Sequence, residues 1–84
     1  MYQAVLSRQA SRTIEKVTLR LQQRLKNVMQ DISDNPLEGK RLHGNFEGLM
    51  SVRVGEWRIV YEIDTENSII VVHGIGPRGQ IYKS

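Results

Sequence analysis

Two arginines near a predicted chain reversal are the side chains of this sequence best suited to chemistry. In the stretch RVGEWRIVYEI, Arg53 and Arg58 stand on either side of the turn dipeptide Gly55-Glu56. Because strand residues alternate between faces, both arginines are predicted on the open face, close together across a hairpin. Two guanidinium groups repel one another unless an anion or a carboxylate lies between them. The pair therefore indicates either a phosphate site or an ordinary polar face on which Glu62 neutralises one arginine.

Other kinds of site have little support in the sequence. The two histidines, His43 and His73, are far apart and lack the spacing of metal ligands. His73 alternates with apolar neighbours, which predicts a histidine of the core or of a sheet edge. The chain has no cysteine for a thiolate site, and GIGPRG does not open a helix as a nucleotide-binding loop does. We therefore expect no metal and no cofactor.

The first part of the chain carries most of the positive charge. The net charge of the 84 residues is +3, and residues 1–30 contain six basic residues and one acid, Glu15. This imbalance indicates an anionic partner, either nucleic acid or an acidic protein, and solvation of helix faces explains it equally well. The absence of cysteine and of any long apolar run predicts a cytoplasmic protein without a membrane-spanning segment.

The periodicity of the apolar residues predicts a single small domain over residues 1–84. A short first strand at 2–6 is followed by an amphipathic helical stripe, for which Ser7 is the predicted N-cap. Thr18 is a second possible N-cap, so the stripe forms either one long helix or two, at about 8–17 and 19–33.

After a polar connection at 40–47, the pattern changes to the period of two that is typical of strands. Three strands are predicted, at 49–54, 57–63 and 69–76, and the last is apolar enough to lie inside the sheet. The order β-α(α)-β-β-β predicts the α+β class. We expect an antiparallel sheet with one or two helices on one face and the first strand at its edge.

A set of motifs in the second half of the chain is typical of a known family. LHGNFEGLMSVRVGEWRIVYEI and IIVVHGIGPRGQIY contain Leu-x-Gly, a second Gly, Arg-Val-Gly, an aromatic-Arg-aliphatic-aliphatic-Tyr run, and a closing Gly-x-Arg before Ile-Tyr. DNP at 34–36 ends the predicted helix. This collinear set, with the chain from 2 to 82, resembles the RelE/ParE superfamily of toxins from toxin–antitoxin pairs, and its RelE-like branch in particular. The resemblance implies a RelE-like fold.

The resemblance to the RelE branch implies a ribosome-dependent endoribonuclease. Such a toxin cleaves mRNA in the A site without a metal, by attack of a ribose 2′-hydroxyl on the adjacent phosphate. Arg58 matches the arginine that stabilises the phosphate, and Arg78 matches a second arginine with a similar role. Tyr82 matches a C-terminal tyrosine that acts as base or orients the substrate. Ser51 and Arg53 stand where the best-studied members carry two lysines, so Arg53 supplies charge and Ser51 only a hydroxyl.

Further cations are expected to contact ribosomal RNA. The expected contacts are Lys40, Arg41, Ser51, Arg24 and Lys26, with Arg8, Arg12, Lys16 and Arg20 as further helical candidates. The resemblance also implies a cognate antitoxin that lays an acidic or amphipathic helical segment on the basic helices or across the open sheet face. Contact with DNA is expected only indirectly, through the antitoxin complex.

Three functions remain open from the sequence. The first is the endoribonuclease, which the retained Arg58, Arg78 and Tyr82 favour. The second is a ParE-like toxin that binds and inhibits DNA gyrase and cleaves nothing. The third is a toxin-like remnant that only binds its antitoxin or RNA, which the hydroxyl at Ser51 favours.

Overall fold

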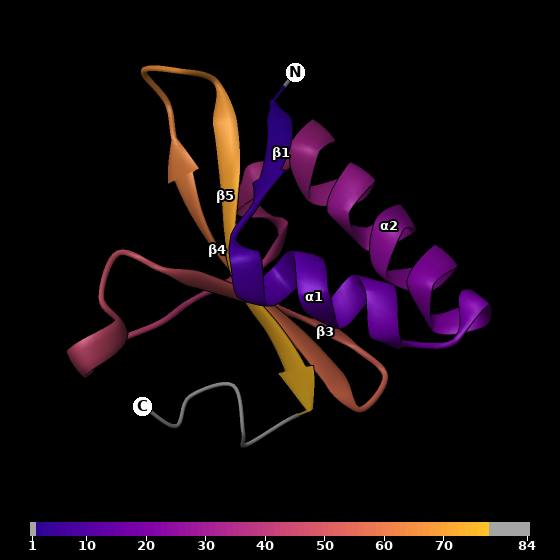
Figure 1. Cartoon of the computed structure of the whole chain (residues 1–84). Coiled ribbons are helices and arrows are strands. Elements are labelled where there is room, and N and C mark those ends of the chain that lie inside the picture. Colours follow the sequence, from indigo (N-terminus) through magenta and orange to yellow (C-terminus); the bar gives the residue numbers. More distant parts are fainter. Residues whose placement is uncertain (1, 78–84) are drawn as a thin grey trace.

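A five-stranded sheet forms the centre of the protein (Figure 1). The computed structural model describes residues 2–77 of the 84. The strands lie in the order β1 (Gln3–Leu6), β5 (Ile69–Pro77), β4 (Trp57–Asp64), β3 (Met50–Val54) and β2 (Lys40–Arg41). The α+β class, the edge position of the first strand and the interior position of the last strand are confirmed.

One strand departs from the antiparallel arrangement expected for the sheet. β1 runs parallel to β5, with Gln3 opposite Ile69 and Leu6 opposite Val72, whereas the other neighbouring strands are antiparallel. The chain leaves β1 through two helices and returns to its side only in the last strand. No hairpin therefore fixes the relative direction of β1 and β5.

The helical stripe forms two helices, which is one of the two alternatives predicted from the sequence. α1 (Arg8–Lys16) begins after Ser7, whose Oγ accepts a hydrogen bond from the Ala10 N–H at 3.2 Å. α2 (Leu19–Asp34) begins after Thr18, whose Oγ1 accepts from the Leu21 N–H at 3.2 Å. Both caps have extended backbone and satisfy N–H groups that a helix leaves unpaired. The second cap therefore marks the break between the helices.

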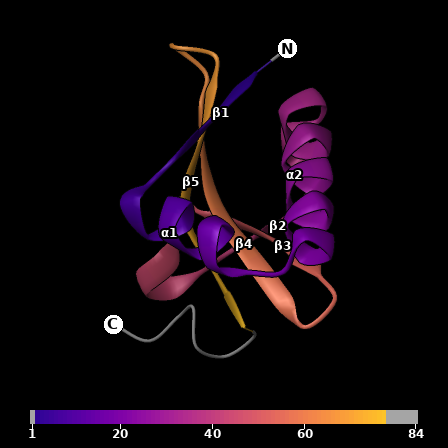
Figure 2. The ribbon, with the colours of Figure 1, turned by 45° about the vertical axis from the view of Figure 1, so that its right-hand side comes forward.

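Both helices contribute to one core, from different positions. α2 lies along one face of the sheet, and α1 lies beside β5 where β1 has ended (Figure 2). There the Gln9 side-chain amide donates to the Ile75 carbonyl at 3.0 Å and accepts from the Ile75 N–H at 2.9 Å. A side chain thus continues the edge of β5 that β1 leaves unpaired. The largest fully buried side chains are Tyr61, Leu25, Ile32, Ile59, Ile70 and Ile75.

The predicted polar connection contains a strand that the sequence did not reveal. η1 (Pro36–Glu38) leads into β2, and η2 (Gly44–Phe46) follows it. The fully buried Tyr61 ties this segment to the sheet, because its hydroxyl donates to the Pro36 carbonyl at 2.7 Å and accepts from the Gly39 N–H at 3.1 Å. Burial raises the pKa of Tyr61. A Cβ at Gly39 would lie 2.5 Å from that hydroxyl, so only glycine fits there.

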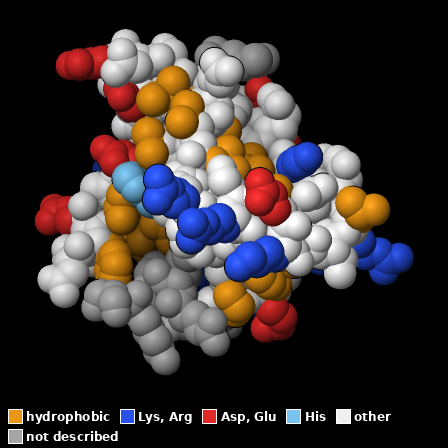
Figure 3. Space-filling model, in the orientation of Figure 1, with side chains coloured by type: hydrophobic (Ala, Val, Ile, Leu, Met, Phe, Trp, Pro, Cys, Tyr) orange, Lys and Arg blue, Asp and Glu red, His pale blue; other side chains and the backbone are white. Residues whose placement is uncertain are grey.

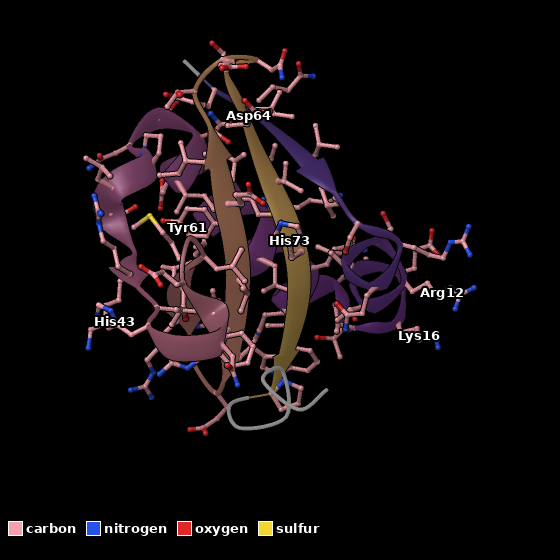
Figure 4. The ribbon with its side chains drawn as sticks, turned by 90° about the vertical axis from the view of Figure 1, so that its left-hand side faces the viewer. Arg12, Lys16, His43, Tyr61, Asp64 and His73 are labelled. Atoms are coloured by element: carbon pink, nitrogen blue, oxygen red, sulfur yellow. The ribbon has the colours of Figure 1, made fainter. Side chains whose placement is uncertain are left out.

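A β-bulge in β5 changes the expected surroundings of His73. Val60 pairs with Gly74 and Tyr61 pairs with Val72, which leaves His73 as an extra residue on β5. The prediction of a core or edge histidine is wrong, because His73 is exposed and its Nε2 lies 2.9 Å from an oxygen of Glu62 (Figure 4 shows its position on β5). Glu62 therefore has a partner other than the arginines proposed from the sequence.

Candidate anion-binding site

The hairpin between β3 and β4 brings the two arginines together as predicted. Gly55 has a positive φ of 62°, which suits glycine, and the two-residue turn pairs Val54 with Trp57. Arg53 is consequently the direct cross-strand partner of Arg58. Side chains of such partners lie on the same face with Cβ atoms about 4.5–5.5 Å apart. The predicted juxtaposition on the open face of the sheet is confirmed.

The two arginines differ in how they are held. Arg53 is exposed, whereas Arg58 is half-buried and its Nη1 donates to the Oγ of Ser51 at 2.9 Å. Ser51 is itself only 2% exposed. The Nε of Arg58 is buried and has no hydrogen-bond partner among residues 2–77. An unsatisfied buried donor on a cation costs about 1–3 kcal/mol or more, so the contacts of Arg58 within residues 2–77 leave its guanidinium incompletely satisfied.

A third cation shares this face. Lys40 on β2 is directly opposite Ser51, whereas Arg41 is opposite Met50 of the core face. Lys40 is exposed, and by parity it lies on the same face as Arg53 and Arg58. The sequence grouped Lys40 with its neighbour in chain order, because a strand of two residues shows no period of its own. The structure separates the two cations.

No carboxylate neutralises this group of cations in the described part of the chain. The single ion pair found within residues 2–77 joins Glu62 to His73, beyond the bulge. Like charges directly opposite each other destabilise a sheet unless a counter-charge is present. Lys40, Arg53 and Arg58 around the Ser51 hydroxyl therefore form a candidate site for a phosphate, which suits forked guanidinium donors.

The other predicted RNA contacts are not on the sheet face that carries this site. Arg24 of α2 lies near the hairpin turn, since a Cβ at Gly55 would be 3.4 Å from its Nη1 and Nη2. Lys26 lines a groove between β1 and α2 with Met29. Arg41 lines a cavity of about 280 Å³ that Met50 also lines.

The basic residues of α1 form a surface of their own. Arg8, Arg12 and Lys16 line a shallow groove on this helix. Figure 3 shows Lys and Arg side chains in a row over it, and Figure 4 shows Arg12 and Lys16 pointing away from the sheet. The helical cations therefore do not converge with Arg58.

Two of the predicted catalytic residues, Arg78 and Tyr82, lie outside the described residues. Within residues 2–77, no group of three His, Asp or Glu side chains could hold a metal ion. In the same part of the chain, no helix is both long and apolar enough to cross a membrane.

The small α+β fold, with its cationic site on the open face of the sheet, agrees with a family match over almost the whole chain. Residues 4–82 match the family described as the ParE toxin of type II toxin-antitoxin system, parDE. The chain belongs to this family, within the RelE/ParE superfamily of toxins.

Individual relatives agree with this assignment. Toxin RelG of Mycobacterium tuberculosis (strain ATCC 25618 / H37Rv) is 37% identical over 54 residues, which are 63% of this chain and 62% of RelG. The match thus spans less than two thirds of RelG.

Solved structures have the same fold. A chain of the toxin-antitoxin complex RelBE2 from Mycobacterium tuberculosis matches with a TM-score of 0.83 and 29% identity, over 92% of this chain and 98% of that one. The isolated E. coli RelE toxin matches with a TM-score of 0.81 and 20% identity, over 98% of this chain and 92% of RelE. The RelE-like fold expected from the sequence is confirmed.

Proposed function

We propose that this toxin is an endoribonuclease that cleaves mRNA in the A site of the ribosome and thereby inhibits translation. The observation that carries the proposal is Arg58, a half-buried cation with an unpartnered Nε among the described residues, directly opposite Arg53. Such an arrangement favours an oxyanion that accepts from several fixed donors at once. The similarity to RelE-like folds supports the same choice.

The proposed reaction needs no metal. The ribose 2′-oxygen attacks the adjacent phosphorus, a new P–O2′ bond forms, and the P–O5′ bond breaks to leave a cyclic phosphate and a 5′-hydroxyl. Negative charge grows on the phosphoryl oxygens in the transition state, and the guanidinium groups of Arg58 and Arg53 stabilise that charge. Following the resemblance, we assign Arg78 to the same phosphate and Tyr82 to the proton of the 2′-hydroxyl.

The proposed partners are a cognate antitoxin and the ribosome with its mRNA. RelBE2 of M. tuberculosis and RelBE of E. coli are toxin–antitoxin complexes, which supports an antitoxin here. An acidic or amphipathic antitoxin segment complements both the open sheet face and the basic surface of α1. We assign contacts with ribosomal RNA to Arg41, Arg24 and Lys26, and place the toxin in the cytoplasm, where translation occurs.

Inhibition of DNA gyrase is a second candidate function. The match to the ParE family model favours it, and so does Ser51, whose hydroxyl is a weak group for proton transfer. In this alternative the open face binds a protein surface and no bond is cleaved.

A translating extract and a gyrase supercoiling assay separate these functions. The purified wild-type toxin is added to both, and mRNA 5′ ends are mapped by primer extension. The endoribonuclease gives new 5′ ends within A-site codons, and the double variant Arg53→Ala/Arg58→Ala gives none. Intact mRNA together with inhibited gyrase contradicts the proposal and supports the second candidate. Inertness in both assays favours a protein that only binds.

A further inference from the structure

Cleavage of the P–O5′ bond requires a proton donor that the arginines cannot provide. The leaving 5′-oxygen must gain a proton, and general acids contribute about 10²–10⁴-fold to such steps. Guanidinium groups stay protonated in proteins, so Arg53 and Arg58 supply charge but do not transfer protons. Among the described residues of this cationic surface, Lys40 carries the only amine, which makes it the candidate for this donor.

The register of the sheet places Lys40 opposite Ser51, the residue that Arg58 contacts. Lys40 is the direct partner of Ser51, and the Ser51 hydroxyl accepts from Arg58 at 2.9 Å. The lysine side chain is exposed and lies on the same face, and its flexible four-carbon arm is long enough to reach past Ser51 to a phosphate held by Arg58. Arg41, the next residue, belongs to the opposite face.

The position of Lys40 is fixed by contacts in the core. β2 has only two residues, too few to determine its own register. The Tyr61 hydroxyl holds the Pro36 carbonyl and the Gly39 N–H, and Gly39 directly precedes Lys40. A Cβ at Gly39 would also lie 2.8 Å from the Ser51 carbonyl, which shows how closely the two strands approach here. The buried Tyr61 hydroxyl thus fixes the position of the backbone just before Lys40.

We propose that Lys40 is the general acid of the cleavage reaction. As the 2′-oxygen bonds to phosphorus and the P–O5′ electron pair moves to the 5′-oxygen, the Lys40 ammonium gives that oxygen a proton. The resulting amine regains a proton from water, while the proton of the 2′-hydroxyl goes to the base. This inference rests on the proposed endoribonuclease function, and it assigns a reaction step to a residue that the sequence alone placed among RNA contacts.

The test changes both the residue and the leaving group. Single-turnover cleavage is measured on ribosomes whose A-site codon carries either the ordinary phosphodiester or a 5′-bridging sulfur, which leaves without protonation. We expect Lys40→Ala and Lys40→Arg each to slow cleavage of the ordinary linkage about 10²-fold. On the sulfur-containing linkage, both variants cleave within a few-fold of wild type.

Two further variants control for charge and position. Glu62→Ala removes a charge from the same sheet face, beyond the bulge, and is expected to change the ordinary rate less than about 3-fold, which is far below a general-acid effect. Lys40→Ala/Ser51→Lys returns an amine to the same cross-strand row and should recover at least part of the lost rate. Thermal unfolding of each variant confirms that it folds.

The outcomes separate this inference from the proposed function. Lys40→Ala that cleaves the ordinary linkage like wild type, or that is equally slow on the sulfur linkage, overturns the role of Lys40 and leaves the nuclease intact. A wild-type toxin that cleaves neither linkage overturns the proposed function, and the role of Lys40 with it.

Discussion

The two ends of β4 carry charged side chains on the same open face, but these side chains differ in whether they have partners within the chain. Beyond the bulge, the Nε2 of His73 lies 2.9 Å from an oxygen of Glu62, so these two polar side chains are partners within the chain. Next to the hairpin, Arg58 faces Arg53, and its buried Nε has no acceptor among the described residues. The end with Glu62 has a polar partner within the chain, whereas the end with Arg58 has more hydrogen-bond donors and positive charge than its described neighbours can pair.

This difference indicates which end is built for a ligand. A folded chain can provide a carboxylate partner for a surface cation. At the far end of β4, Glu62 is such a partner for His73. Near the hairpin, the cross-strand partner of Arg58 on β3 is an arginine, and the buried Ser51 accepts one hydrogen bond from the Arg58 Nη1. Leaving the Arg58 guanidinium without a full set of acceptors costs stability, and an anion that binds during function would supply the missing acceptor.

The largest expected effect compares one substitution at each end of β4. Arg58→Ala should lower A-site cleavage about 10²–10³-fold, because it removes a preorganised donor to the transition state. Glu62→Ala, on the same strand and face, should leave cleavage within a few-fold of wild type. Primer extension over a time course measures both. Equal losses in the two variants would show that the ends do not differ in function.

A smaller effect is expected where polar groups on the core face of β4 are satisfied. Tyr61→Phe leaves the Pro36 carbonyl and the Gly39 N–H without their partner, so the free energy of unfolding should fall by about 1–3 kcal/mol. Tyr2→Phe, at a half-buried tyrosine outside β4, should change it by less than about 0.5 kcal/mol. Urea denaturation measures both, and similar values for the two would refute a special role of the Tyr61 hydroxyl.

The same tyrosine predicts a dependence of stability on pH. Burial raises the pKa of Tyr61, so the native state holds this proton more tightly than the unfolded chain does. Its contribution is complete below the pKa of the unfolded tyrosine, about 10, and is lost as the pH rises through the folded value. The stability difference between wild type and Tyr61→Phe should therefore narrow above that pH in urea titrations. A difference that stays constant or grows would contradict this linkage.

The smallest expected effect has the opposite sign. Arg58→Met removes the buried donor that lacks a partner and keeps an extended side chain, so stability should rise by about 1 kcal/mol while cleavage is lost. Denaturation and primer extension on the same preparation measure the two quantities. A clear loss of stability would mean that Arg58 is held mainly for the fold, and the contrast between the ends of β4 would lose its basis.

The sequence was sufficient where local signals repeat over several residues. Alternation and the Gly55-Glu56 turn placed Arg53 opposite Arg58, and hydroxyl caps at Ser7 and Thr18 marked two helix starts. These features depend on neighbours in the chain, whose spacing is visible in the sequence.

Features set by distant contacts were missed. β2 has two residues, and its pairing depends on a hydrogen bond between Gly39 and Tyr61, which are 22 positions apart. Lys40 and Arg41 were consequently predicted together as RNA contacts, and the direct pairing of Lys40 with Ser51 was not predicted. The bulge leaves His73 as an extra residue on β5, where its Nε2 lies 2.9 Å from Glu62, and a glycine after that histidine was its only local signal.

The most direct test of the central claim observes the Arg58 side chain itself. The Nε–H resonance of Arg58 is followed by NMR while a trinucleotide with 2′-deoxyribose at the reacting position, which cannot be cleaved, is added. An anion held between the arginines predicts a saturable shift of this resonance that persists in Glu62→Ala and weakens in Arg53→Ala. An Arg58 resonance that does not move, or moves no more than that of Arg20 on the helix surface, would contradict the account.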